Sequence, residues 1–454
     1  MQTAGAVALG FGGLQTLAGC ARTRPELWRD VPYGYGPLQP DSNGILELPE
    51  GFSYSIISRH GDLMDDGFLV SHVPDGMATF AGPDGLTILI RNHEVNHRAD
   101  TGHGPFGAAN EKLAQMPSWM IYDAGSPGQP CLGGTSTVIY DTRRQQVVRQ
   151  YQSLIGTLRN CAGGPTPWGT WVTCEEDVHR AGDGLRADHG YCFEVLASTD
   201  IVLANPVALK AMGRFNHEAI AVDPSSGAVY LTEDRNDGLL YRFLPDVPGR
   251  LVEGGRLQAL VVTDRQGLDT RNWENRDIGV GETMSVSWID LDDVEAPDDD
   301  LRLRGHGMGA ATFARGEGMW YGMGAVYFAC TNGGSERKGQ IWKYTPSPEE
   351  ATSAEASAPG MLELFVEPDD GNVVDNADNL TVTPWGDLIL CEDGSGEQFL
   401  VGVTPQGEIY KFARNVVSES ELAGATFSPD GSTMFLNIQH EGLTLAVTGP
   451  WRHG

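Results

Sequence analysis

Acidic residues follow several short predicted strands of this sequence, and each of these strands is preceded by a turn containing glycine. In the clearest copy, the turn at residues 166–169 leads into an alternating strand from Thr170 to Cys174, and two glutamates follow at once. The turn occurs six times, with its glycine at positions 85, 169, 227, 324, 386 and 431. In three copies the first carboxylate lies six residues after the glycine, so these strands present acidic groups in one register. The acidic residues found after the strands are Glu94, Glu175, Glu176, Glu233, Asp234 and Glu392.

These repeated strand units predict an all-β fold, a β-propeller of about six blades. Equivalent strands of a propeller surround a central axis, so equivalent strand ends meet at one mouth of the central channel. Carboxylates gathered there would repel one another strongly unless cations lay between them. We therefore expect a metal site at one mouth of the channel. The alternative is that each acid is an ordinary solvated turn residue.

A second set of candidate ligands precedes the turns. Cys161, Glu218, Glu317 and Asp378 each lie a few residues ahead of a turn, in segments that we expect to be loops entering the inner strands. Oxygen ligands alone would suit Ca²⁺, whereas a thiolate such as that of Cys161 favours a transition metal. Arg315 is the only arginine recognised in these segments, and its guanidinium could bind a phosphoryl or carboxylate group with two hydrogen bonds. Two alternatives stay open: Cys161 as a small buried apolar residue and Arg315 as one partner of a structural salt bridge.

The composition indicates a turn-rich and acidic protein. The chain has 454 residues, of which 59 are glycine and 26 are proline, and its formal net charge is −30. This charge argues against nucleic acid and anionic membrane surfaces as partners. We expect a monomer with one propeller domain over residues 45–450, carrying insertions near residues 236–310 and 346–360.

The N-terminal residues predict export. Residues 1–19 carry no charge, and Leu17-Ala18-Gly19-Cys20 matches the lipobox of bacterial lipoproteins. We therefore expect an export signal at residues 1–20, with a lipid anchor at Cys20 as one outcome, and a linker at residues 21–44. The expected location is the periplasm or the cell surface.

Four segments together resemble the PhoX family of bacterial alkaline phosphatases: residues 160–176, 213–219, 230–235 and 313–318. The resemblance extends from about residue 45 to residue 445. It implies a six-bladed propeller that is exported by the twin-arginine route and holds iron (Fe³⁺) and calcium (Ca²⁺) at the channel mouth. No twin-arginine pair precedes the apolar N-terminal segment, and the lipobox indicates a different anchor.

The resemblance also implies roles for individual residues. Cys161 corresponds to the cysteine ligand of the family, Glu317 to a metal-binding glutamate and Arg315 to the arginine that contacts phosphate. Arg315 and Glu317 are therefore the expected catalytic residues. The expected metal ligands are Cys161, Glu94, Glu176, Glu218, Glu233, Asp234, Glu317, Asp378 and Glu392.

The implied reaction is metal-dependent hydrolysis of small-molecule phosphomonoesters. The cations would offset the phosphate charge and activate an oxide or hydroxide nucleophile, while Arg315 would stabilise charge on the transferring group. Two other classes stay open. A Ca²⁺-dependent lactonase-like propeller hydrolase would need neither Cys161 nor Arg315, and a non-catalytic surface propeller would use its metals for stability alone. Iron together with calcium in the purified protein would favour the phosphatase over both.

Overall fold

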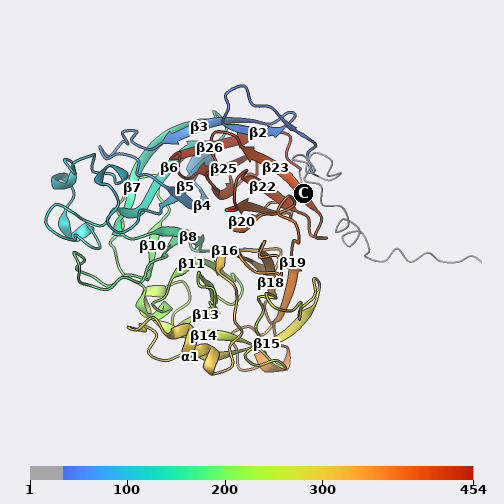
Figure 1. Ribbon diagram of the computed structural model, residues 1–454. Helices are drawn as coiled ribbons and strands as arrows, with labels where there is room; N and C mark the ends of the chain where they lie inside the picture. The colour runs from blue at the N-terminus through green and yellow to red at the C-terminus, as the bar shows by residue number, and fades with distance from the viewer. Residues whose placement is uncertain (1–33, 453–454) are drawn as a thin grey trace, which may run out of the picture.

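Short strands make up nearly all of the regular structure in the computed structural model, which describes residues 34–452 (Figure 1). The export signal and the lipid anchor at Cys20 lie outside the described residues, as does most of the expected linker. Within residues 34–452, no helix is long and apolar enough to span a membrane. The helices of this part are α1 (Leu301–Gly307) and the 3₁₀ segments Pro83–Gly85, Thr101–His103, Leu113–Gln115, Ser118–Met120, Lys210–Met212, Leu251–Glu253 and Glu355–Ser357.

Most strands form antiparallel sheets in which strands adjacent in the sequence are also adjacent in space. Tight turns allow this order, because two antiparallel strands can be joined by only a few residues. Two such sheets lie in the N-terminal half of the chain. The first contains β4 (Pro74–Ala81), β5 (Leu86–His93), β6 (Gly133–Asp141) and β7 (Gln146–Thr157), and the second contains β8 (Asn160–Pro165), β9 (Thr170–Glu175) and β10 (Cys192–Leu196).

The middle of the chain forms one continuous sheet of nine strands. β15 links its two halves, because it pairs with β14 on one side and with β19 on the other. The segment 236–310, expected as an insertion, contains β13, β14, β15 and α1. The strands of this sheet are β11 (His217–Val222), β12 (Val229–Glu233), β13 (Leu240–Pro245), β14 (Gly255–Val262), β15 (Thr283–Asp290), β16 (Gly316–Gly322), β17 (Ala325–Cys330), β18 (Gln340–Thr345) and β19 (Met361–Val366).

N-terminal strands complete the two sheets that the C-terminal part of the chain forms. β3 (Ser53–Arg59) pairs with β26 (Leu443–Thr448), and β2 (Leu46–Pro49) pairs with β23 (Ile409–Asn415). In Figure 1 these blue N-terminal strands lie beside the red C-terminal ones, so strands from the two ends of the chain belong to the same sheets. The other strands of the two sheets are β1 (Leu38–Gln39), β20 (Ala377–Val382), β21 (Leu388–Glu392), β22 (Phe399–Val403), β24 (Leu422–Phe427) and β25 (Thr433–Ile438).

Six strands surround the centre of the molecule. β4, β8, β11, β16 and β20 each contact the next strand in this order, β20 contacts β24, and β24 contacts β4 again. These are the segments that precede the glycine turns. The expectation that they would be loops is therefore wrong, because each pairs with the strand after its turn and is itself the innermost strand. The expected all-β, propeller-like fold is confirmed.

Small residues allow the innermost strands to approach one another closely. A Cβ atom placed on Gly76 of β4 would lie 2.7 Å from the Cα atom of Ala162 on β8. A Cβ atom on Gly318 of β16 would lie at the same distance from the Cα atom of Asn379 on β20. No side chain fits at either position, so these glycines permit the ring to close tightly.

Candidate metal centre

The innermost strands share a local irregularity that positions one side chain of each. In all six, the pairing with the next strand shifts register near its start, as it does at a β-bulge. Because a bulge bends its strand, it can turn a side chain toward a site that regular pleating would not reach. In five of these strands the residue after the first paired one is a potential metal ligand, and in β24 it is Ala423. The five candidate ligands are Asp75, Cys161, Glu218, Glu317 and Asp378.

A repeated backbone hydrogen bond brings a second set of side chains to the same place. In each repeat, the strand that follows the glycine turn is the second strand. The residue just after this second strand donates its N–H to the carbonyl of the residue just before the innermost strand, with N–O distances of 2.9–3.3 Å. This bond fixes the far end of the second strand against the start of the first. The donor–acceptor pairs are Glu94–Val73, Glu176–Arg159, Asp234–Asn216, Thr331–Arg315, Asp393–Asn376 and Gln439–Glu421.

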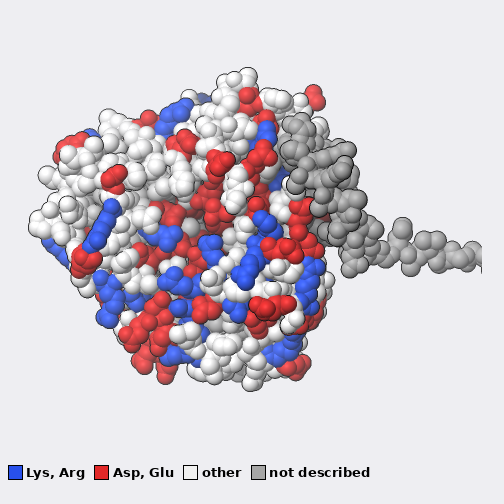
Figure 2. Space-filling view, in the orientation of Figure 1, with Lys and Arg blue, Asp and Glu red and all other residues white. Residues whose placement is uncertain are grey.

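The two sets of side chains form a continuous band of overlapping triplets. Within each triplet, one ligand atom of every residue lies within 4.8 Å of the others. Consecutive triplets share one residue, so the band contains eight carboxylates and one thiol. On the face of the molecule drawn in Figure 2, acidic side chains gather over the middle, with basic groups beside them. The triplets are Asp75–Glu94–Cys161, Cys161–Glu176–Glu218, Glu218–Glu317–Asp378 and Asp378–Asp393–Glu421.

Two carboxylates of this band, Glu218 and Asp378, lack partners that buried charges require. Both oxygens of Glu218 and Oδ1 of Asp378 are buried and have no hydrogen-bond partner in the described part of the chain. Burial, together with the neighbouring carboxylates, raises the pKa of Asp75, Glu218 and Glu317 well above the usual range. Burial raises the pKa of Asp378 to about 7. Unpaired buried carboxylates at such short spacing are stable only if they bind protons or cations, so these residues fit a multi-cation site.

Cys161 distinguishes this band from a site made of oxygen ligands alone. Its side chain is buried, and it belongs to two triplets at once. Burial, and then the charges of Asp75 and Glu218, raise the pKa of the thiol well above its ordinary value. The thiol therefore stays protonated unless a cation displaces the proton, which is how metals bind cysteine. A sulfur donor among carboxylates favours a transition metal over Ca²⁺ at this position.

Two arginines, not one, lie at the edge of the band. Nε of Arg315 lies 2.7 Å from Oδ1 of Asp234, and its Nη2 lies 2.7 Å from Oε1 of Glu317. Arg159 stands at the equivalent position of another repeat, and its Nη2 lies 2.7 Å from both Oε1 of Glu94 and Oε2 of Glu176. The expectation that Arg315 is the only arginine in these segments is therefore wrong.

The two arginines differ in the groups that they leave free. Every guanidinium nitrogen of Arg159 contacts an acceptor, because Nε binds Glu94 and Nη1 donates to the carbonyl of Glu176. Nη1 of Arg315 has no partner among the described residues, whereas Nε and Nη2 are both held by acids. The side chain of Arg315 is 34% exposed. Arg315 is thus held in place with two N–H groups available to a ligand.

Not all of the expected ligands join the band. Glu233 accepts hydrogen bonds from the hydroxyl of Tyr241 and the N–H of Leu239, and Glu392 binds Nζ of Lys411 at 2.6 Å. Both glutamates are the last residue of a strand that follows a glycine turn, and after Glu392 it is the next residue, Asp393, that belongs to the band. Side chains alternate along a strand, so consecutive acids at a strand end point in different directions. Asp234 lies against Arg315 and is outside the four triplets.

Three carboxylates of the band were not recognised from the sequence: Asp75, Asp393 and Glu421. Asp75 belongs to a Pro-Asp-Gly tripeptide that also occurs at residues 83–85, where it forms the expected turn. The signal that could have found Asp75 is its place about ten residues before the turn glycine, close to the 7–9 residues that separate the other four ligands from theirs. Asp393 directly follows an acid that had been recognised, and the alternation of side chains could have pointed to it.

The geometry defines a class of protein: an all-β, propeller-like protein with a cluster of acidic and cysteine ligands at the centre. Residues 33–442 match the family described as alkaline phosphatase PhoX. The chain belongs to this family, whose members are metal-dependent phosphomonoester hydrolases, and its substrates are accordingly phosphomonoesters. The resemblance inferred from the four sequence segments is thereby confirmed.

A solved structure of another member of this family shows the same fold. The chain is similar to Pseudomonas fluorescens PhoX in complex with vanadate, described as a transition state analogue, with 19% identity, a TM-score of 0.65 and coverage of 89% of this chain and 96% of that one. It is also similar to a Xanthomonas campestris gluconolactonase, with 12% identity, a TM-score of 0.41 and coverage of 92% and 99%. The comparison with curated proteins returned no significant match.

Proposed function

We propose that Cys161 and the surrounding carboxylates hold iron and calcium ions, and that this centre hydrolyses phosphomonoesters with the help of Arg315. The observation that carries the proposal is the position of Cys161, whose thiol is shared by two carboxylate triplets of one band. A calcium-only hydrolase would have no use for a buried thiol at this point. Membership of the alkaline phosphatase family supports the same reaction.

The donor sets suggest where each kind of cation would bind. The triplets Glu218–Glu317–Asp378 and Asp378–Asp393–Glu421 offer only carboxylate oxygens, which Ca²⁺ prefers. The triplets that include Cys161 combine sulfur with oxygen and would hold iron. When bound, the cations would neutralise phosphate charge and supply a nucleophile at neutral or alkaline pH.

The residues of this chain would bind and orient the substrate. Arg315 is anchored by Asp234 and Glu317 and would direct its free Nη1 at a phosphoryl oxygen. Charge that develops on the transferring group would then meet a donor that does not need to reorganise. Glu317 would have two roles, since it is both a candidate metal ligand and a residue that holds the Arg315 guanidinium in place.

The finer features of the architecture and location are also proposals. Counted by its innermost strands, the molecule would have six blades, with the nine-stranded sheet formed by two blades that β15 joins. We place this propeller in one domain over residues 45–450. The apolar N-terminus supports export to the periplasm or the cell surface, with lipidation at Cys20 as one anchor, and the acidic charge supports a monomer that does not bind nucleic acid.

The test is an activity comparison on purified full-length protein. We expect release of p-nitrophenol from p-nitrophenyl phosphate and no hydrolysis of gluconolactone. Cys161→Ser should abolish the phosphatase activity, whereas Cys391→Ser, at a buried cysteine of β21 outside the band, should retain it. Lactone hydrolysis that survives Cys161→Ser would overturn the proposal in favour of a calcium-dependent lactonase.

A further inference from the structure

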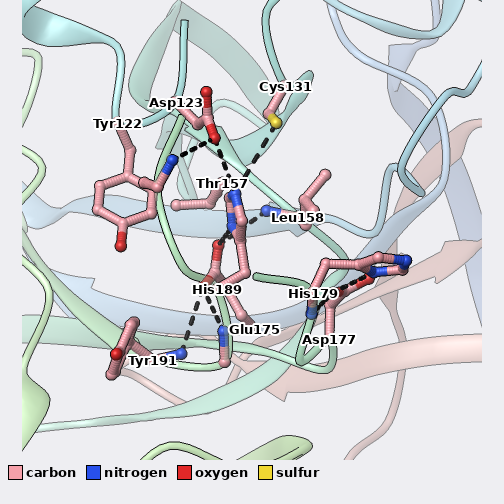
Figure 3. A network of polar contacts seen from close by, with 12 residues as sticks. Tyr122, Asp123, Cys131, Thr157, Leu158, Glu175, Asp177, His179, His189 and Tyr191 are labelled. Atoms are coloured by element: carbon pink, nitrogen blue, oxygen red, sulfur yellow. Dashed lines mark hydrogen bonds and ion pairs between the residues drawn. The ribbon is translucent and has the colours of Figure 1, made fainter. Parts of the chain in front are cut away.

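A second cluster of potential ligands lies apart from the central band. Asp123 and Cys131 come from the segment between β5 and β6, and His189 comes from the loop between β9 and β10 (Figure 3). One ligand atom of each lies within 4.8 Å of the others, and the cluster shares no residue with the central triplets. The side chains are 0%, 6% and 0% exposed, respectively. Three donors from distant parts of the chain thus converge in the interior.

The distance between His189 and Asp123 suits two ligands of a tetrahedral cation, whereas Cys131 would have to move about 0.5 Å toward His189 to complete that geometry. Nε2 of His189 lies 3.3 Å from Oδ2 of Asp123 and 4.0 Å from Sγ of Cys131. Oxygen and nitrogen ligands at about 2.0 Å from zinc, at tetrahedral angles, lie about 3.3 Å apart, and a sulfur ligand lies about 3.5 Å from the nitrogen. A hydrogen bond between an imidazolium and a carboxylate is shorter, about 2.7–2.9 Å. The separation of His189 from Asp123 therefore equals the one expected for two ligands of one ion, and the N–H groups of Arg186 and Ala187 hold Oδ2 of Asp123 in this position.

The other ring nitrogen of His189 has the partner that a metal-binding histidine needs. Its Nδ1 lies 2.6 Å from Oε1 of Glu175, a buried carboxylate at the end of β9. The remaining oxygen of Glu175 accepts hydrogen bonds from the N–H groups of Gly190 and Tyr191. A carboxylate in this position fixes the ring and keeps the proton on Nδ1, so that Nε2 is free to bind a metal.

The charges of the cluster are also compatible with a divalent cation. Without a metal, a protonated His189 would lie between the carboxylates of Asp123 and Glu175, beside a neutral Cys131 thiol, for a net charge of −1. A divalent ion that replaces the proton on Nε2 of His189 and the proton on Sγ of Cys131 leaves this net charge unchanged. Both protons pass to solvent, and no electron is transferred.

We propose that Asp123, Cys131 and His189 form a second, structural metal site that takes one zinc ion. The site ties the loop between β9 and β10 to the segment that precedes β6. It also holds Glu175, and Glu176 of the central band is the next residue in the chain. A zinc ion here would thus fix the end of the strand that delivers Glu176 to the main centre. The proposal does not depend on the reaction that the main centre catalyses.

The experiment separates this site from the main centre by removing the other candidate thiolate ligand. Full-length protein carrying Cys161→Ser is produced in medium with zinc, or with cobalt as a spectroscopic substitute, and its metals are quantified after dialysis. We expect about one equivalent of tightly held zinc. In the cobalt form we expect a sulfur-to-cobalt charge-transfer band in the near ultraviolet. Adding Cys131→Ser should abolish the band and the retained zinc, whereas adding Cys391→Ser should change neither.

Two results would overturn the proposal. One is the absence of retained zinc and of the thiolate band in the Cys161→Ser protein. The other is an undiminished band after Cys131→Ser. If Cys131→Ser does not fold, X-ray absorption at the zinc edge of the Cys161→Ser protein decides the question. One sulfur and at least one imidazole nitrogen are expected around the zinc, and an all-oxygen shell would contradict the assignment.

Discussion

Glu175 and Glu176 are consecutive residues with separate partners. Oε1 of Glu175, at the end of β9, lies 2.6 Å from Nδ1 of His189, which is in the loop between β9 and β10. Oε2 of Glu176 lies 2.7 Å from Nη2 of Arg159, and this carboxylate belongs to the central band. The end of one strand therefore connects a buried structural network to the candidate metal centre.

This division predicts different consequences for two matched substitutions. Glu175→Gln removes one member of a buried ion pair, which typically costs about 3–5 kcal/mol of unfolding free energy. The main centre should keep its metals in the folded fraction. Glu176→Gln should leave stability less affected but lower metal affinity by at least about 10–100-fold, the loss that removal of an outer-shell partner of a metal ligand already causes. Urea unfolding and metal analysis of both variants would check this, and equal effects of the two changes on metal content would contradict it.

The central band should make the stability of the metal-free protein depend on pH. Burial and like charges raise the pKa of Asp75, Glu218 and Glu317, and burial raises that of Asp378 to about 7. A carboxyl with a raised folded-state pKa stabilises the fold below its unfolded value of about 4 and loses that contribution as pH rises through the folded value. After verified chelation, the melting temperature should therefore fall between pH 5 and pH 8, because each group lowers the free energy of unfolding by about 1.4 kcal/mol per pKa unit of its shift.

Restored cations should reverse this trend. Cations bind the ionised carboxylates, so binding becomes tighter as the pH rises, and a ligand at about 100 times its Kd adds about 2.7 kcal/mol. Thermal unfolding with and without metal at both pH values is the measurement. A melting curve that chelation leaves unchanged at pH 8 would show that the band holds no stabilising cation.

Cys161 should be required for iron. We expect Cys161→Ser to lose iron and turnover, because a hydroxyl is a much poorer ligand than a thiolate for a transition metal. Cys391→Ser is the control, since it makes the same change at a buried cysteine of β21. The amount of iron per folded protein decides the matter. Iron retained by Cys161→Ser and lost by Cys391→Ser would show that the thiol ligand had been misassigned.

Arg315 and Arg159 should respond differently to substitution, although they occupy equivalent positions. Arg315→Ala removes the free Nη1 and should lower turnover by about 30- to 1,000-fold, or 2–4 kcal/mol, as does the loss of a donor to transition-state charge. Arg315→Lys should recover little of this, because lysine lacks the planar fork. Arg159→Ala should mainly lower metal retention, since all of its donors bind Glu94 and Glu176. Full turnover by Arg315→Ala would refute its role at the substrate.

Much of this architecture could be predicted because it repeats. The spacing from glycine turn to strand to acid identified the strand that follows the turn in each repeat. The common place of Cys161, Glu218, Glu317 and Asp378 ahead of the turns predicted that they would lie together, as they do in the band. The bulge at the start of each innermost strand could not be predicted from the sequence. A bulge depends on pairing with another strand, so these segments resembled loops in the sequence.

The differences between the expected and the observed arrangement of the acids at the strand ends have one physical cause. Two consecutive acids look alike in a sequence, yet the side chain of the last strand residue turns toward a partner in its own sheet and the next one toward the band. Glu392 is held in this way by Lys411, and Asp393 joins the triplet instead. Buried partners such as Lys411 lie far along the chain, so no local pattern reveals them.

The most direct test of the central claim is anomalous X-ray diffraction from crystals of the active full-length enzyme, with data collected on both sides of the iron absorption edge. We expect an iron peak at bonding distance from Sγ of Cys161, with carboxylates of Glu176 and Glu218 or of Asp75 and Glu94 beside it. Calcium should lie on the carboxylate-only side of the band. An enzyme with full phosphatase turnover and no metal at Cys161 would show that the thiol holds no catalytic cation.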